Sequence, residues 1–315
     1  MIRTDKIFTV VVCGPTASGK TKLAVDLALE FDGEVVSADS MQIYKGMDIA
    51  SAKPTEAEKM GVPHHLMGFL EPTEAFSVAD YVILARKAIA DIHLRGKLPV
   101  ICGGTGLYIN SLIDNIEFDD TGSDPAYRAE LNALAAEKGA AYLRDMLMAV
   151  DPQSAAELHE NNRKRIIRAL EVYHLSGKTM TELKAQSRLN PSPYEPCMMM
   201  IDHPREVLYE RIDRRVDMML EAGLLDEARE FFTHDDYITA AQAIGYKELR
   251  PYIDGVQTLD ECIDRLKRET RRYAKRQLTW FKKDSRIEHI SAGNDVKYEE
   301  IIKFAKKLVK KYSFL

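Results

Sequence analysis

The chain has 315 residues, of which 45% are hydrophobic and 30% charged, and its net charge is −5 at pH 7. This composition excludes a low-complexity or disordered chain, and the length is sufficient for one large domain or two smaller ones. The average charge gives no sign of a polyanion partner, although an average can hide local basic clusters.

The four cysteines, Cys13, Cys102, Cys197 and Cys262, include no Cys-x-x-Cys pair. This spacing favours small, reduced, apolar residues over a disulfide framework or a zinc site. The early apolar run from Phe8 to Cys13 is too short for the core of a signal peptide, and no run approaches the roughly 20 apolar residues of a membrane span. We therefore expect a soluble, cytoplasmic protein without a membrane partner.

The first part of the chain alternates between strand and helix patterns. The run from Ile7 to Cys13 is continuous, apolar and β-branched, which is typical of a strand buried on both faces of a parallel sheet. The following predictions are a helix from Lys20 to Phe31, a strand at residues 35–37, a helix at residues 77–94 capped by Ser77, and a strand from Leu98 to Cys102. This order predicts a doubly wound α/β fold.

A polar stretch from Asp119 to Pro125 ends the alternation. Residues 125–187 are predicted to be helical, and a strand is expected again from Cys197 to Ile201. We therefore predict a P-loop NTPase-like α/β core formed by residues 1–118 and 197–315, interrupted by a helical insertion domain at residues 119–196. The last part of the core is expected to be mostly helical, with a strongly basic helix from Arg265 to Lys283.

Residues 14–21, GPTASGKT, match the phosphate-loop pattern G-x-x-x-x-G-K-[ST], between a predicted buried strand and a predicted helix. The loop amides and the helix N-terminus would cradle phosphate oxygens, Lys20 would add a charge, and Thr21 would offer its hydroxyl to Mg²⁺. Such loops are common in ATP-binding proteins, but the motif indicates phosphates and not necessarily a nucleotide. The predicted phosphate-binding residues are Gly14, Pro15, Thr16, Ala17, Ser18, Gly19, Lys20 and Thr21.

Asp39 stands at the carboxyl end of the second predicted strand, the edge at which parallel sheets bind ligands. A carboxylate there could bind Mg²⁺ or act as a general base, and a capping or turn role is the structural alternative. The third strand ends in Gly103-Gly104-Thr105 and lacks the carboxylate that orders Mg²⁺ in ordinary nucleotidases. This difference argues against an ordinary NTPase.

The chain contains two local clusters of basic residues, although its net charge is negative. The first comprises Arg163, Lys164, Arg165 and Arg168, with Ile166, Ile167, Leu170 and Val172 on the predicted buried side; the second comprises Arg265, Arg268, Arg272 and Arg276 along one stripe of a helix. Either cluster alone could be a solvated face, but two of them favour a nucleic-acid partner. Trp280 and Phe281 could stack on a base, although a place in the helix core is the favoured interpretation.

Taken together, these segments resemble the tRNA dimethylallyltransferases, also called tRNA isopentenyltransferases. The matching segments run in family order from residue 14 to about residue 282: GPTASGKT, SADSMQIYKGMDIASAKP, PHHLMG, PVICGGTGLY, RIIRALEVYHLSGKT, RIDRRVDMMLEAGLLDEA, QAIGYKE and RRYAKRQLTWFK. Each motif alone is unspecific, whereas the ordered set is highly specific. The resemblance implies transfer of a dimethylallyl group from dimethylallyl diphosphate to N6 of adenosine 37 in tRNA, with release of diphosphate.

The resemblance also implies a role for individual residues. The phosphate loop and Mg²⁺ would hold the diphosphate, Asp39 would be the general base, Thr105 would lie at the reacting centre, and Arg215, beside Arg214, would contact the diphosphate. The target adenine would leave its stack to reach Asp39 in a channel, and the helical insertion would clasp the anticodon stem-loop. The residues that match tRNA-binding stretches are Asp39, Ser40, Met41, Gln42, Thr105, Arg128, Lys164, Arg165, Ile166, Ile167, Arg168, Gln242, Ala243, Ile244, Gly245, Tyr246 and Lys247.

The sequence departs from the family pattern at Ala50-Ser51, where Gly-Thr is common, and it shows no counterpart of the eukaryotic C-terminal zinc finger. We therefore expect a bacterial-type enzyme, and a monomer is the family expectation.

Three alternative functions remain at this point. A small-molecule P-loop kinase would bind ATP, an adenylate prenyltransferase would act on free AMP or ADP without the basic clusters, and an RNA-binding GTPase-like switch would carry an N-K-x-D motif, which is not found.

Overall fold

The structure is a computed structural model, and it describes residues 6–116, 122–187, 189–234, 237, 243–293 and 296–313. The chain forms two compact units, one comprising Met1–Ile113 with Pro193–Leu315 and the other Asp114–Ser192. We call them the α/β unit and the helical unit. The helical unit begins and ends a few residues before the predicted limits of 119 and 196, since the strand that follows it already begins at Tyr194.

The described part of the α/β unit contains a six-stranded parallel sheet in the order β3-β2-β4-β1-β5-β6. The strands are β1 (Ile7–Cys13), β2 (Gly33–Ser37), β3 (His64–His65), β4 (Leu98–Gly103), β5 (Tyr194–Asp202) and β6 (Ile287–Ser291). The predicted α/β fold with a parallel sheet is confirmed. The central strand β1 is buried along most of its length, as its continuous apolar sequence predicts.

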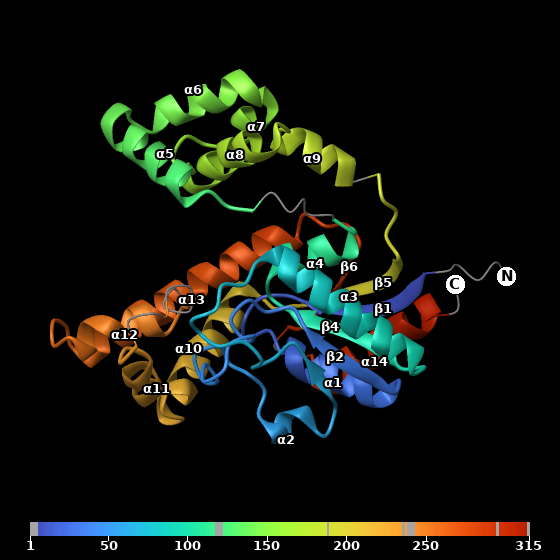
Figure 1. Cartoon of the computed structure of the whole chain (residues 1–315). Coiled ribbons are helices and arrows are strands. Elements are labelled where there is room, and N and C mark those ends of the chain that lie inside the picture. Colours follow the sequence, from blue (N-terminus) through green and yellow to red (C-terminus); the bar gives the residue numbers. More distant parts are fainter. Residues whose placement is uncertain are drawn as a thin grey trace. The chain divides into compact units, whose positions relative to one another are not determined.

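Helices cover both faces of this sheet (Figure 1). One face packs against α1 (Lys20–Glu30) and α14 (Tyr298–Ser313), and the other against α3 (Val78–Leu94) and α4 (Gly106–Ile113). Ser77 caps α3 as predicted, because its side chain accepts a hydrogen bond from the Asp80 amide in a capping box. All four cysteines are buried and unpaired, as expected for small apolar residues.

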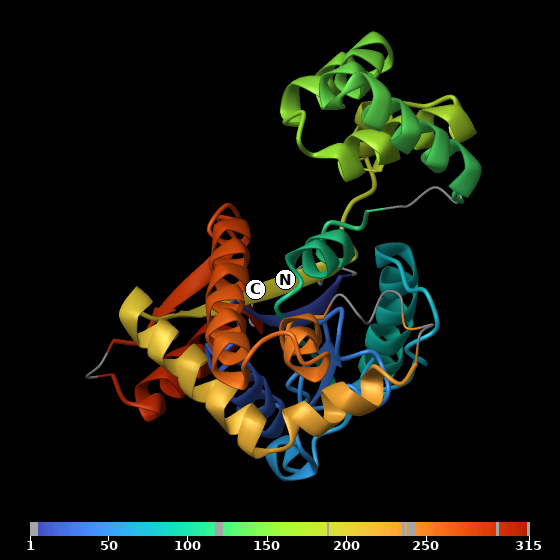
Figure 2. The ribbon, with the colours of Figure 1, turned by 90° about the vertical axis from the view of Figure 1, so that its left-hand side faces the viewer.

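A third apolar cluster holds the remaining helices of the α/β unit against the loop that follows β2. These helices are α10 (Arg205–Glu221), α11 (Leu224–Phe231), α12 (Tyr246–Ile253) and α13 (Leu259–Phe281), and a short helix α2 (Glu56–Lys59) lies in the segment after that loop. Figure 2 brings α10 to α13 toward the viewer and shows them gathered at one side of the sheet. Within the described residues, no helix has both the length and the apolar character needed to span a bilayer.

The helical unit contains α5 (Pro125–Lys138), α6 (Ala140–Val150), α7 (Pro152–Glu157), α8 (Arg163–Ser176) and α9 (Met180–Ser187). Asp124 and Asp151 cap α5 and α7, each of which has proline in its first turn. The core of this unit is built from residues that recur at helical spacing, including Leu143 and Leu147 on α6 and Ile166 and Leu170 on α8. The predicted helical segment is therefore confirmed.

The register of the sheet brings the ends of β1, β2 and β4 to one level. Cys13 lies opposite Gly103, and Ser37 lies opposite Cys102. The pairing continues past the strands, because the Ala38 amide donates to Cys102 O at 2.8 Å and the Thr105 amide donates to Ala38 O at 3.1 Å. The loops that follow these three strands therefore emerge side by side at the carboxyl edge of the sheet.

Candidate active site

The phosphate loop joins β1 to α1 in the predicted context. Gly14, Ala17 and Gly19 adopt positive φ angles of 137°, 63° and 92°, which turn the chain sharply around the loop. The N-terminus of α1 has neither a side-chain cap nor an acidic residue in its first turn, so its dipole favours an anionic ligand. Lys20 Nζ donates to Pro15 O at 3.2 Å, and burial lowers the pKa of Lys20.

Gln277 from α13 supports this loop from the side. The Thr16 amide donates to Gln277 Oε1 at 2.9 Å, while Gln277 Nε2 donates to Gly104 O at 3.0 Å. A Cβ atom at Gly104 would lie only 2.2 Å from Gln277 Nε2, so glycine is required for this approach. The side-chain amide thus links the loops that follow β1 and β4.

Two further side chains hold carbonyl groups of the phosphate loop. Arg211 Nε on α10 donates to Ala17 O at 2.8 Å, and His203 Nε2 lies 2.9 Å from Ser18 O. The sequence analysis singled out neither of these residues nor Gln277. Arg211 and Gln277 lie inside RIDRRVDMMLEAGLLDEA and RRYAKRQLTWFK, two of the segments that resemble the family, and that position is the signal that could have found them.

Asp39 directly follows the end of β2 and is half-buried. Its Oδ1 accepts hydrogen bonds from the Met41 amide at 2.9 Å and the Gln42 amide at 3.4 Å, which fix the carboxylate in an Asx-type turn. Among the described residues, nothing donates to Oδ2. The carboxylate therefore has one anchored oxygen and one oxygen available to accept a proton.

Thr105 lies behind Asp39. Its Oγ1 accepts a hydrogen bond from the Ser40 amide at 3.1 Å and lies 3.4 Å from Ser40 Oγ. Thr105 is not among the residues that line the two cavities described below. The structure therefore gives Thr105 a contact with the loop that carries Asp39, and places it one layer away from the cavity surface.

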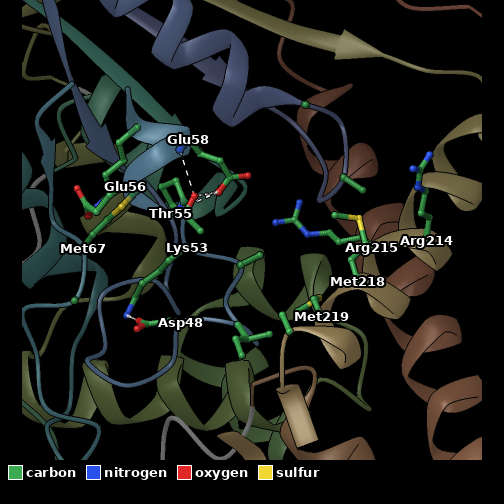
Figure 3. Close-up of a pocket in the computed structure, with 18 of the residues that line it drawn as sticks. Asp48, Lys53, Thr55, Glu56, Glu58, Met67, Arg214, Arg215, Met218 and Met219 are labelled. Atoms are coloured by element: carbon green, nitrogen blue, oxygen red, sulfur yellow. Dashed lines mark hydrogen bonds and ion pairs between the residues drawn. The ribbon is translucent and has the colours of Figure 1, made fainter. Parts of the chain in front are cut away.

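Two cavities meet at this edge of the sheet. The smaller cavity, of about 280 Å³, is lined by Asp39, Lys20, Thr21 and Arg215, among others. The larger cavity, of about 890 Å³, is drawn in Figure 3, and Asp48, Ile49 and Ala52 of the loop at residues 48–52 line it. In that view, Arg214 and Arg215 come from α10 on one side, while Lys53 and Glu58 stand opposite. Both cavities include Ala52 and Arg215.

The charge of the smaller cavity is strongly unbalanced. Among the described residues that line it, Asp39 is the one carboxylate, against four cationic side chains, Lys20, Arg215, Lys247 and Arg276. Burial lowers the pKa of Arg215, which means that its charge is poorly solvated and would gain from an anionic ligand. Arg214 is exposed and lines only the larger cavity. Of the two neighbours, Arg215 is therefore the one placed to act on a bound anion near Asp39.

The donor set of the site fits a magnesium ion held mainly by a phosphorylated ligand. The Thr21 hydroxyl and the Asp39 carboxylate line the same cavity and are hard oxygen ligands of the kind Mg²⁺ prefers. In the described part of the chain, no group of three or more His, Cys, Asp or Glu side chains could hold a metal ion by itself. Mg²⁺ commonly uses one or two protein ligands and completes its shell with water and substrate phosphates.

The predicted tRNA-binding residues of the α/β unit are only partly accessible. Ser40, Met41, Gln42, Ala243, Ile244 and Lys247 line the smaller cavity, and Gln242 lies outside the described residues. Tyr246 is 0% exposed, and its hydroxyl donates to Glu227 Oε1 at 2.8 Å. The Tyr246 side chain is therefore held inside the unit by Glu227, and a contact of this residue with tRNA stays a prediction.

The predicted tRNA-binding residues of the helical unit are likewise partly exposed and partly buried. Lys164 and Arg165 are exposed, whereas Ile166 and Ile167 are 0% and 6% exposed and belong to the core of the unit. The helix turns the side chains of these two isoleucines away from its basic face. Their burial confirms the prediction made from helical periodicity, and the tRNA contact that the resemblance implies for this stretch stays a prediction.

The basic helix α13 contains both solvent-facing and site-facing arginines. Arg268 and Arg272 are exposed and pair with Glu269, while Arg276 lines the smaller cavity. Phe281 is 1% exposed, so its predicted core position is confirmed. The core position favoured for Trp280 is wrong, because its side chain is 38% exposed and Nε1 donates to Asn110 Oδ1 at 3.3 Å.

Known proteins match this chain both in sequence and in fold. A family model described as IPP transferase matches residues 42–284, and one described as isopentenyl transferase matches residues 7–66. The tRNA dimethylallyltransferase of Geobacillus thermodenitrificans is 50% identical over 306 residues, covering 96% of each chain. The crystal structure of the full-length tRNA isopentenylpyrophosphate transferase from Bacillus halodurans matches with a TM-score of 0.72 and 45% identity over 98% of both chains. A eukaryotic dimethylallyltransferase acting on tRNA matches with a TM-score of 0.83 and 29% identity, covering 97% of this chain and 80% of that chain. The chain therefore belongs to the tRNA dimethylallyltransferase family.

Proposed function

We propose that the protein transfers the dimethylallyl group of dimethylallyl diphosphate to N6 of adenosine 37 in tRNA and releases diphosphate. The observation that carries this proposal is that the phosphate loop and Asp39 line one cavity, whose described lining residues comprise a single carboxylate and four cationic side chains. A base and an anion-binding loop in one cavity suit a reaction that removes a proton from one substrate and a diphosphate from the other.

The phosphate loop would bind the diphosphate of the donor. Loop amides such as those of Ala17 and Gly19, the α1 N-terminus, Lys20 and Arg215 would hold its oxygens, and the poorly solvated cations would be stabilised by the negative charge that grows on the leaving group. Thr21 would hold Mg²⁺ together with oxygens of the diphosphate, and the ion would neutralise part of that charge. The larger cavity also reaches the loop at Ala17 and Gly19, which gives the donor a second path to it.

Asp39 would serve as the general base. Adenine N6 attacks C1 of the dimethylallyl group, the bond from C1 to the diphosphate oxygen breaks, and the N6 proton passes to the Asp39 carboxylate. The Met41 and Gln42 amides support this role because they hold Oδ1 and leave Oδ2 free among the described residues. Thr105 would position the base through the Ser40 amide, so it is better described as a positioning residue than as a catalytic one.

The tRNA would be bound by basic residues of each unit. In the helical unit, Lys164 and Arg165 are exposed on α8 and suit phosphate contacts with an anticodon stem-loop. In the α/β unit, Lys247 and Arg276 at the smaller cavity suit the nucleotides around a flipped adenine. With tRNA as the substrate, we place the enzyme in the cytoplasm, and we propose that it acts as a monomer, as the family resemblance implies.

The proposal is tested with labelled dimethylallyl diphosphate offered to the purified protein with tRNA, with AMP, or with ATP alone. We expect label in tRNA and none in AMP. Label in AMP would support an adenylate prenyltransferase, and ATP turnover without label in tRNA would support a kinase. Either of these outcomes would contradict the proposed function.

A further inference from the structure

Glu227 on α11 binds the backbone of a loop far away in the sequence. Its Oε2 accepts hydrogen bonds from the Asp48 amide at 3.0 Å and the Ile49 amide at 2.8 Å, and its Oε1 accepts one from the Ala50 amide at 2.9 Å. Three successive amides thus converge on one carboxylate, and such a set of backbone donors is a favourable site for a negative charge. Here the charge is supplied by a side chain of the same protein.

The loop that Glu227 holds separates the two cavities of the site. Asp48 and Ile49 line the larger cavity, Ala50 and Ser51 line the smaller one, and Ala52 lines both. On its other side, the loop is held by Gln42, whose Nε2 donates to Ser51 O at 3.3 Å and to Ala52 O at 3.2 Å. The position of loop 48–52 therefore sets the shape of both cavities at once.

A second connection runs from Glu227 to the segment 243–247. The Tyr246 hydroxyl donates to the same Oε1 that accepts the Ala50 amide, and the ring packs 4.3 Å from that of Phe231. Burial and the neighbouring Glu227 raise the pKa of Tyr246, so its hydroxyl remains protonated and keeps donating. Gly245 lies directly on the loop, since a Cβ atom there would be 3.3 Å from Ala50 Cβ.

We propose that Glu227 and Tyr246 are positioning residues for the transfer reaction, which fix loop 48–52 relative to segment 243–247. Ala243, Ile244 and Lys247 of that segment line the smaller cavity, so a tRNA bound there would bear on the loop that also walls the larger cavity. Through this link, binding of tRNA stabilises the loop position that receives the donor. The inference rests on the proposed function for the identity of the two ligands.

The test uses two substitutions that keep most of the packing. Glu227→Gln leaves one acceptor oxygen and turns an NH₂ group toward amide donors, whereas Tyr246→Phe removes only the hydroxyl from a buried aromatic cluster. The matched controls are Glu230→Gln, an exposed glutamate on the same helix α11, and Tyr252→Phe on the same helix α12. The dissociation constant of dimethylallyl diphosphate is measured with and without a saturating anticodon stem-loop that carries purine in place of the target adenine, so that no transfer occurs. The values of kcat and KM with the ordinary stem-loop and the melting temperature are measured alongside.

We expect the bound stem-loop to strengthen donor binding in the unsubstituted protein and in both controls. Glu227→Gln should weaken donor binding about tenfold when the stem-loop is present, which is the scale of a lost charge-assisted hydrogen bond, and should change it little when the stem-loop is absent. Tyr246→Phe should act in the same direction with a smaller effect. KM for the donor should rise accordingly, more than kcat falls.

The proposal is overturned if both variants keep the full effect of the stem-loop on donor binding, or if the unsubstituted protein shows no such effect. It is also overturned if donor binding weakens equally with and without the stem-loop, in step with the melting temperature, because that pattern indicates general loss of structure. These binding measurements need no turnover. A protein that binds both ligands but transfers no label to tRNA would instead contradict the proposed function.

Discussion

Arg128 and Glu171 form a two-pronged ion pair in the helical unit, with Arg128 Nε 2.7 Å from Oε1 and Arg128 Nη2 2.9 Å from Oε2. Arg168 adds a third contact, from its Nη1 to Oε2 at 2.7 Å. Burial acts to raise the pKa of Glu171, but the hydrogen bonds from the two arginines outweigh it and hold the pKa below its ordinary value. One buried carboxylate thus orients two arginines that are predicted to bind tRNA.

Replacement of Glu171 by glutamine should weaken tRNA binding even though Glu171 is itself 0% exposed. The reason is that Arg128 and Arg168 lose the partner that fixes their guanidinium groups before tRNA arrives. Filter binding or fluorescence anisotropy with an anticodon stem-loop checks this, with the exposed Glu137→Gln on α5 as the control. Equal affinities for the two variants would show that the arginines need no such orientation.

Removal of charge at Lys164 and Arg165 should lower tRNA affinity and flatten its dependence on salt. Each phosphate contact that is lost reduces the slope of log K against log salt by about 0.7 to 0.9. The double alanine variant is compared with Lys303→Ala combined with Lys307→Ala, two exposed lysines on α14. A slope equal to that of the control would make the basic face of α8 a solvated surface without a role in tRNA binding.

Asp39→Asn should abolish most turnover while tRNA still binds. An amide cannot take the N6 proton, and loss of a general base lowers kcat by about 10² or more. Single-turnover rates and tRNA affinity are measured together, with Asp91→Asn, at an exposed position on α3, as the control. Unchanged kcat in Asp39→Asn would remove Asp39 from the role of base.

Gln277→Ala should loosen the phosphate loop, because it leaves the Thr16 amide and Gly104 O without the bridge between them. We expect a higher KM for dimethylallyl diphosphate and a loss of stability of about 1 to 3 kcal/mol, the usual cost of unsatisfied buried polar groups. Lys275→Ala, an exposed position on the same helix, serves as the control. Donor KM values that match those of the control would show that the loop holds its shape without Gln277.

The stability of the α/β unit should fall at acid pH because of Glu34. Hydrogen bonds from Arg95, assisted by His65 at 2.7 Å, lower the pKa of this carboxyl from 4.5 to about 2. A lowered pKa means that the stabilising contribution is complete above pH 4.5 and is lost as the pH falls toward 2. Urea unfolding across this range should therefore give a shallower pH dependence for Glu34→Gln than for the unsubstituted protein, and the exposed Glu221→Gln should not differ from the latter.

Local patterns predicted most of the fold. The run Ile7–Cys13, the helix after the phosphate loop and the helices of the insertion all follow from apolar spacing and capping residues close in the sequence. The strand β3 was missed because it has only two residues, and β6 because its only buried residues are Ile287 and Ile290, too few to mark a buried strand. The phosphate loop and the position of Asp39 could also be predicted, because both depend on residues close to them in the sequence.

The supports of the site were not predictable from the sequence. Gln277 meets Thr16 across 261 positions, and Arg211 meets Ala17 across 194, so no local spacing links either pair. Ile166 and Ile167 show the opposite case, because helical periodicity alone predicted that they are buried, and the structure confirms it. A stretch matched to a family does not distinguish these buried side chains from the exposed ones beside them. A contact assigned to a stretch of residues does not say which of its side chains faces the partner.

The bridge made by Gln277 also determines when, during translation, the active site can be completed. Gln277 follows Thr16 by 261 positions, so the side chain that braces the phosphate loop is translated only after that loop and the whole helical unit have been made. Domains can fold as they emerge, so the helical unit can mature on a nascent chain whose donor site still lacks its brace. Catalytic competence is therefore a late property of this polypeptide, acquired when α13 docks, and a chain stopped before that helix would carry the phosphate-loop motif without a finished active site.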